Sequence, residues 1–104
     1  MKQDRKRQAF LEVKEQINEN LEILHIRISD YTDQGMMDED FALYNQIASL
    51  LEELDDCHSF EELVEIVIKG KQIEHDIDSW FAMHGGTTIE LTWPEKIIKH
   101  FLES

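Results

Sequence analysis

Apolar residues recur at steps of three and four between positions 10 and 31. This spacing is typical of one face of an amphipathic helix, and Gly35 is suited to the left-handed conformation that ends one. We therefore predict a long N-terminal helix. Leu11, Ile23 and Ile26 widen its apolar stripe, so we expect it to contact two neighbouring helices or a second subunit. The main stripe comprises Phe10, Val13, Ile17, Leu21, Leu24, Ile28 and Tyr31.

A second helix is predicted to begin at Asp38, which is a suitable N-cap residue. Asp40 then falls in the first turn, where a negative charge is favourable. We expect this helix to end near Asp55 or Asp56, although two acids at a helix C-terminus oppose its dipole. Its predicted apolar face comprises Phe41, Tyr44, Ile47, Ala48, Leu51 and Leu54.

A third helix has the clearest start in the chain, because Ser59 and Glu62 match a capping box. Two glycines, Gly85 and Gly86, are expected to end it. Gly70 lies near its inward stripe, which indicates close approach of a neighbouring helix or a functional kink. Its predicted apolar residues are Phe60, Leu63, Val64, Val67, Ile73, Ile77, Trp80 and Phe81.

The last part of the chain is predicted to be an extended connector, residues 87–93, followed by a short helix. Thr92 and Glu95 match a second capping box, and Pro94 is tolerated in a first helical turn. We expect Trp93 to cover the end of the bundle or to form a contact patch. The fold class is therefore all-α: a single domain, residues 1–104, that forms an antiparallel three-to-four-helix bundle with a long N-terminal and a short C-terminal helix.

The chain is strongly acidic, with 23 Asp and Glu against 10 Lys and Arg, and a formal net charge of −13. Such a charge keeps a protein soluble, but it disfavours direct binding to nucleic acid, because phosphate contacts need clustered positive side chains. A hydrophobic content of 41% is nevertheless sufficient for one folded core. A basic protein partner is compatible with this composition, and nucleic acid is not an expected ligand.

The acidic residues are unevenly distributed. From Ile28 to Ile68 the chain holds 12 acids and no Lys or Arg, whereas Lys2, Arg5, Lys6 and Arg7 crowd its start. We predict a non-catalytic protein-binding module of inhibitor, immunity or nucleic-acid-mimic type. Its second and third helices would engage a basic partner. The candidate contact residues are Asp38, Asp40, Glu52, Glu53, Asp55, Asp56, Glu61, Glu62 and Glu65.

Paired carboxylates suggest an alternative. Glu62 and Glu65 lie three residues apart, a spacing that places both on one helix face. Within Phe60 to Ile66 they resemble the Glu-x-x-Glu of the all-α nucleoside triphosphate pyrophosphohydrolases of the MazG-like group. That resemblance implies Mg²⁺-dependent hydrolysis. The downstream Glu-x-x-Asp of that group is missing here, so we predict no cofactor and no metal site, and a non-enzymatic role is preferred.

Self-association is the third alternative, in which the basic N-terminus of one subunit docks on the acidic helices of another to give a homodimer. Cys57 is the single cysteine, so an intrachain disulfide is impossible and a reducing compartment is expected. No apolar run approaches the roughly 18 residues of a membrane span. The polar start from Met1 to Ala9 is unlike a signal peptide, and we therefore expect a cytoplasmic protein that does not enter membranes.

Overall fold

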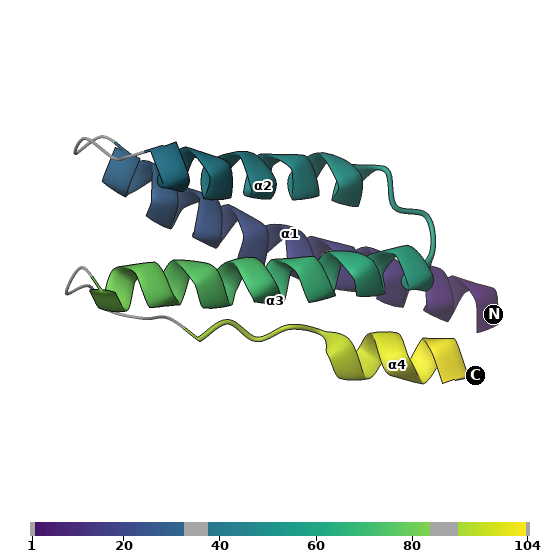
Figure 1. Cartoon of the computed structure of the whole chain (residues 1–104). Helices are drawn as coiled ribbons and strands as arrows, with labels where there is room; N and C mark the ends of the chain where they lie inside the picture. The colour runs from purple at the N-terminus through teal and green to yellow at the C-terminus, as the bar shows by residue number, and fades with distance from the viewer. Residues whose placement is uncertain (1, 33–37, 84–89, 104) are drawn as a thin grey trace.

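The computed structural model describes residues 2–32, 38–83 and 90–103, with side chains for 4–29, 42–83 and 90–103. Four helices account for nearly all of them: α1 (Lys2–Thr32), α2 (Asp38–Asp55), α3 (Phe60–Met83) and α4 (Glu95–Glu103). The all-α prediction is confirmed for this part of the chain, including the long first helix and the short last one (Figure 1). None of the described helices has the length and apolar character that crossing a membrane requires.

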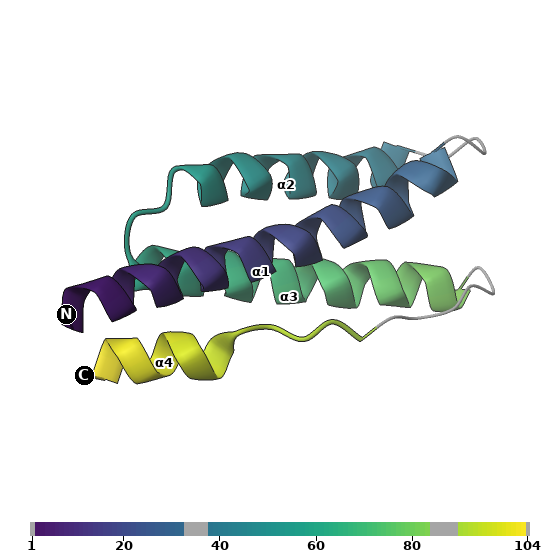
Figure 2. The same ribbon diagram turned by 180° about the vertical axis from the view of Figure 1, so that it is seen from behind.

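The helices form two layers, and helices consecutive in the chain run antiparallel to each other. In one layer α3 lies between α2 and α4, and α1 packs across one side of this layer, where it contacts all three (Figures 1 and 2). α2 and α3 form a hairpin across residues 56–59. This hairpin turn, the start of α1 and the end of α4 all lie at the same end of the bundle.

The core runs along the bundle between α1 and the three-helix layer. It includes five members of the predicted α1 stripe, whereas Leu11, Ile23 and Ile26 are exposed and do not contribute to it. Packing within the chain therefore does not explain why these three positions of α1 are apolar. The buried apolar residues are Val13, Ile17, Leu21, Leu24, Ile28, Ile47, Leu50, Leu54, Cys57, Phe60, Leu63, Ile66, Val67, Ile73, Ile77, Phe81, Trp93 and Ile98.

The start of α3 is held by the predicted pair of Ser59 and Glu62. The Glu62 amide donates to Ser59 Oγ at 3.3 Å, which satisfies one of the free amides of the first turn. The Glu62 carboxylate accepts from Ser59 Oγ at 3.1 Å and from the amide of His58 at 3.4 Å. The return bond of this cap thus reaches the residue before the N-cap, not the N-cap amide that the standard motif uses.

Trp93 lies against the middle of α3, and the prediction that it covers the end of the bundle is wrong. A Cβ built on Gly70 would lie 2.6 Å from Trp93 Cη2 and 3.5 Å from Leu21 of α1. The close neighbour that was predicted at Gly70 is therefore an indole ring of the connector, while α1 is only in ordinary contact. Glycine is required here because any larger residue would meet the buried ring.

Two side chains hold the connector in place. Glu74 of α3 accepts from the amide of Leu91 at 2.9 Å and from the indole Nε1 of Trp93 at 3.4 Å. Asn20 of α1, which is 2% exposed, donates to the carbonyl of Thr92 at 2.8 Å. The extended backbone thereby obtains hydrogen bonds from two helices in place of a partner strand, which the polar groups of a partly buried segment require.

Candidate functional site

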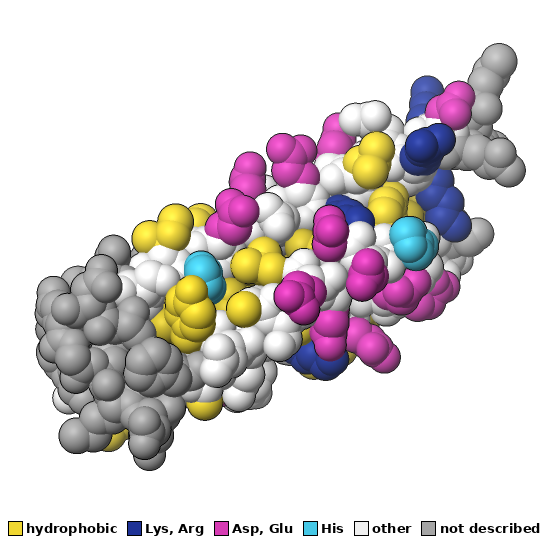
Figure 3. Space-filling model, turned by 90° about the horizontal axis from the view of Figure 1, so that it is seen from above, with side chains coloured by type: hydrophobic (Ala, Val, Ile, Leu, Met, Phe, Trp, Pro, Cys, Tyr) yellow, Lys and Arg dark blue, Asp and Glu magenta, His cyan; other side chains and the backbone are white. Residues whose placement is uncertain are grey.

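Seven of the predicted contact residues have described side chains, and all seven are exposed. They lie at the end of α2, in the hairpin turn and at the start of α3, and we refer to them as the hairpin acids. Viewed from above, acidic side chains follow α1 and α2 over the part of the molecule away from its larger grey end (Figure 3). The side chains of Asp38 and Asp40 lie outside the described residues. The hairpin acids are Glu52, Glu53, Asp55, Asp56, Glu61, Glu62 and Glu65.

The hairpin acids surround the end of the bundle and do not form a single patch. Asp55 lines a hollow between α1 and α2, of about 330 Å³, together with Lys14 and Glu15 of α1. On another side, Glu53 borders the groove between α2 and α3, where Lys69 lies 3.4 Å from its carboxylate. These carboxylates therefore lie on different surfaces of the bundle, and a partner with a flat binding surface cannot contact all of them at once.

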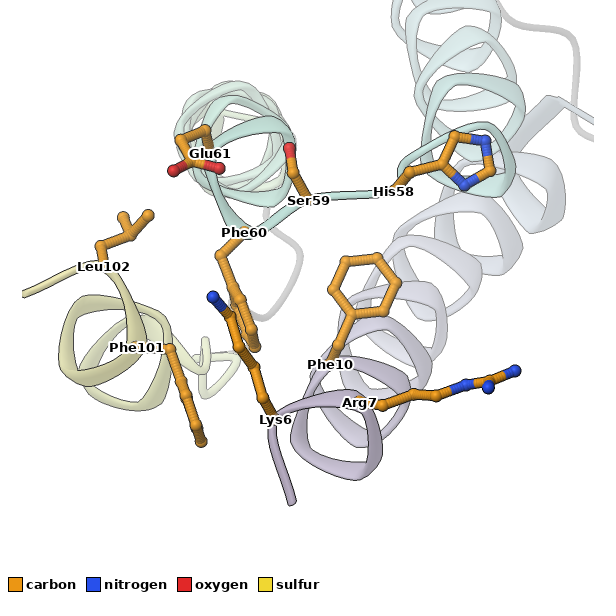
Figure 4. A pocket seen from close by; sticks show the side chains of 9 residues that line it. All are labelled: Lys6, Arg7, Phe10, His58, Ser59, Phe60, Glu61, Phe101 and Leu102. Atoms are coloured by element: carbon orange, nitrogen blue, oxygen red, sulfur yellow. The ribbon is translucent and has the colours of Figure 1, made fainter. Parts of the chain in front are cut away.

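The third of these surfaces is a hollow of about 540 Å³ beside the start of α3 (Figure 4). Glu61 lines it together with Lys6 and Arg7 from the basic start of α1. Its apolar wall includes Phe60 and Phe101, whose rings stack at a centroid distance of 5.0 Å. The basic N-terminal residues thus lie beside the acidic hairpin of their own chain, and self-association through them stays a prediction.

Acidic side chains are concentrated at the C-terminus of α2. Glu52, Asp55 and Asp56 are exposed there, where the unsatisfied carbonyl groups of the helix already give a partial negative charge. Among the described residues, none of these three carboxylates forms a salt bridge. Lys14 of α1 donates instead to the carbonyls of Asp55, at 3.0 Å, and Cys57, at 3.4 Å. One ammonium group therefore caps the helix end while the carboxylates face solvent.

Cys57 is buried below this helix end and is 3% exposed. Its Sγ donates to the carbonyl of Glu53 at 3.3 Å. Burial raises the pKa of the Cys57 thiol, and the negative charge of Glu62 raises it further. A thiol that is held protonated is a poor nucleophile, so this environment suits a structural cysteine.

Of the two carboxylates that suggested an enzyme, Glu62 is part of a helix cap and Glu65 is not. Glu62 accepts hydrogen bonds from Ser59 and His58, while Glu65 lies one turn further along α3 and is exposed. No cluster of three or more His, Cys, Asp or Glu side chains suited to a metal ion occurs in the described part of the chain. Hydrolysis of nucleotides was a prediction from sequence, and these contacts add no support to it.

The acidic residues of α1 were not among the predicted contact residues. Glu12, Glu15, Glu19 and Glu22 are all exposed, and their spacing of three and four places them along one side of the helix. Glu15 reaches the same hollow as Asp55, so this row extends the acidic surface of α2. Their regular spacing is a signal in the sequence, but Lys14 and Arg27 lie near them, whereas the segment from Ile28 to Ile68 holds no basic residue.

Comparison with family models, curated proteins and solved structures gives no match to this chain.

Proposed function

We propose that this chain is a non-catalytic protein-binding module whose acidic surface at the end of α2 engages a basic protein partner. The observation that carries the proposal is the group formed by Glu52, Asp55 and Asp56. These carboxylates are exposed at the negative end of a helix, and no described side chain neutralises them through a salt bridge. Glu15 and Lys14 of α1 line the same hollow as Asp55, and the Lys14 ammonium is directed at the backbone carbonyl of Asp55.

This arrangement is unfavourable for the isolated chain. Each acid at a helix C-terminus costs roughly 0.3–1 kcal/mol at an exposed site, and neighbouring carboxylates repel one another. Local rules of this kind are most often broken where a protein functions, because the loss of stability is offset by binding. A partner that brings Lys or Arg to this surface would relieve the repulsion and interact favourably with the helix dipole.

The proposal places the contact on the α2 side of the bundle. On the other side of the hairpin, Glu61 lies beside Lys6 and Arg7, and Glu53 is already paired with Lys69. These two carboxylates are therefore less available to a basic partner than the group at the end of α2. Charge complementarity at such a surface mainly accelerates association and selects the partner, and salt weakens it by screening.

The proposal is tested by capturing partners from lysate of the native cell with the tagged protein, followed by washes at low and then high salt. We expect a basic protein that is retained at low salt and released at high salt, identified by mass spectrometry. Retention that does not change with salt, or recovery of acidic proteins only, would contradict the proposal. The inhibitor, immunity and nucleic-acid-mimic forms are then distinguished by the activity of the protein that is recovered.

A further inference from the structure

The hollow beside the start of α3 is formed where three helices meet at one end of the bundle. The start of α1, the turn before α3 and the end of α4 line it, and its volume is about 540 Å³. Ligand pockets in proteins typically measure about 300–1,000 Å³. The proposed function concerns the end of α2 and does not use this hollow. We call it the aromatic hollow, because its wall contains the rings of Phe10, Phe60 and Phe101.

The three rings of the aromatic hollow form one continuous apolar wall. Phe10 meets Phe60 edge to face at a centroid distance of 5.5 Å, and Phe60 stacks on Phe101 at 5.0 Å. Phe60 is buried, whereas Phe10 and Phe101 are only half-buried. Each ring comes from a different helix, so the packing of the bundle forms the wall without a ligand. The apolar part of a small molecule that covered these rings would remove apolar surface from water.

Two cations border this apolar wall. Lys6 and Arg7 line the aromatic hollow and extend from α1 in different directions (Figure 4). Both side chains are exposed, and neither forms a salt bridge with another described residue. The positive charge of both side chains is therefore available to a ligand. Other cations of the chain are each paired with an acid, namely Arg27, Lys69, Lys71 and Lys99.

The charge of the lining favours a ligand with a single negative charge. Glu61 is the one carboxylate among the lining residues, so two cations and one acid give a formal charge of +1, counting His58 as neutral. A carboxylate neutralises this charge. A phosphate monoester carries about −1.5 to −2 at neutral pH, and its excess charge would be repelled by a chain with a net charge of −13.

We propose that the aromatic hollow binds a small organic acid, a molecule that joins one carboxylate or similar singly charged group to an apolar ring or chain. Lys6 and Arg7 hold the charged group through charge-assisted hydrogen bonds. The apolar part covers Phe10 and Phe101 and reaches Leu102, which is 40% exposed at the edge of the hollow. This proposal does not depend on the proposed function, which concerns a different surface, and it is tested with the purified chain alone.

The first test uses anilinonaphthalene sulfonate, a fluorescent probe that joins one sulfonate to apolar rings. We expect it to bind the purified protein saturably, at one molecule per chain. Replacing both Lys6 and Arg7 by Gln should weaken this binding roughly tenfold, because two charge-assisted contacts are lost. Phenylnaphthylamine has the same rings without the sulfonate, so its affinity should be unchanged by the two substitutions.

The matched control replaces Arg5 and Lys96 by Gln. Both residues are exposed and neither lines the aromatic hollow. Each double variant removes two cations and changes the formal net charge from −13 to −15. The control should therefore bind the sulfonate as tightly as the wild type does, apart from a small general repulsion that salt screens.

The apolar part of the site is tested by Leu102→Ala, which should weaken the binding of both probes by roughly threefold, because part of the apolar contact is lost. Leu11→Ala is the control, since Leu11 is 51% exposed and does not line the aromatic hollow. Displacement of the sulfonate then tests the charge of the ligand. Naphthoate, with one negative charge, should displace it at a lower concentration than naphthyl phosphate, which has the same rings and more charge.

Three results would overturn the proposal. The first is no saturable binding of the sulfonate by the wild type. The second is equal weakening by the Lys6 and Arg7 pair and by the Arg5 and Lys96 pair, which would attribute binding to net charge alone. The third is displacement by naphthyl phosphate at the same concentration as naphthoate, or at a lower one. Circular dichroism verifies that each variant remains helical, which is expected because all the altered side chains are exposed.

Discussion

Gly70 packs so closely against the indole ring of Trp93 that a methyl group on Gly70 would lie 2.6 Å from Cη2. These residues are 23 positions apart, and their contact joins the middle of α3 to the connector before α4. Trp93 is only 9% exposed, and Glu74 accepts a hydrogen bond from its Nε1. The ring is thus held from two sides, and the position of α4 depends on it.

Gly70→Ala is expected to destabilise the protein. In an exposed helix interior this substitution stabilises by about 1 kcal/mol, because alanine restricts the unfolded chain and favours helix. At Gly70 the added methyl displaces Trp93, and overpacking of this kind typically costs about 1–3 kcal/mol. We predict a net loss in the free energy of unfolding, measured by urea denaturation.

The control for this prediction is Gly70→Ala in a Trp93→Leu background. Without the indole ring the methyl group has room, so the same substitution should become neutral or stabilising there. Equal effects of Gly70→Ala in the two backgrounds would show that the contact with Trp93 is not the cause.

Glu74→Gln is expected to lower the free energy of unfolding by about 1–2 kcal/mol, because the carboxylate accepts from both Leu91 and Trp93. A glutamine side chain has a single acceptor oxygen and cannot serve both donors equally well. Glu90→Gln in the same connector is the matched control, since Glu90 is exposed and should change stability by less than about 0.5 kcal/mol. Similar losses for the two variants, measured by urea denaturation, would argue against this role for Glu74.

Asp55→Asn is expected to stabilise the protein by about 0.3–1 kcal/mol, because it removes a negative charge from the C-terminus of α2. Glu61→Gln tests the opposite sign of the interaction with a helix dipole, since Glu61 lies in the first turn of α3, where a negative charge is favourable. That substitution should destabilise by a similar amount. Thermal unfolding of both variants at low salt checks the signs, and a loss of stability from Asp55→Asn would refute the electrostatic account of this helix end.

The buried thiol of Cys57 makes stability depend on pH. Its pKa is raised in the folded protein, so the unfolded chain loses the proton first as pH increases. The contribution of Cys57 is therefore fully present below the unfolded pKa of about 8.5, and it declines as pH rises above that value toward the folded pKa. We expect the difference in unfolding free energy between the wild type and Cys57→Ala to be constant near neutral pH and to shrink in alkali. A difference that stays flat through alkaline pH would contradict this prediction.

The helices of this protein were predictable because their signals are local. The apolar spacing of α1, the acid Asp38 and the capping pair at Ser59 each act over a few residues, and the structure confirms the start of α2 at Asp38 and of α3 at Phe60. The tight turn between α2 and α3 followed from the same signals. Fold class therefore followed from periodicity and caps.

Contacts between distant residues could not be predicted in this way. The connector is held by Asn20 and Glu74, two polar residues of α1 and α3. Their hydrogen-bond partners lie 17 or more positions away in the chain, and no local sequence pattern identifies them. For the acidic site, the sequence indicated which acidic residues take part but not how they are arranged in space. Whether Glu53, Asp55 and Glu61 share one surface depends on the rotation of each helix, and the structure places them on three different sides.

The central claim is that charge at the end of α2, and not net charge alone, binds a basic partner. Two variants of equal charge separate these possibilities. The first neutralises Glu52, Asp55 and Asp56 as Gln, Asn and Asn. The second neutralises Glu90, Glu95 and Glu103 as Gln, which are exposed positions on the connector and on α4, a helix that does not contact α2. Each changes the formal net charge from −13 to −10, because three carboxylates are removed.

The decisive measurement is the amount of the salt-sensitive basic protein that each variant captures from native lysate, compared with the wild type. We predict that the variant altered at the end of α2 loses most of the captured protein, while the other variant retains it. Equal retention by the two variants, or equal loss, would contradict a binding site at the end of α2.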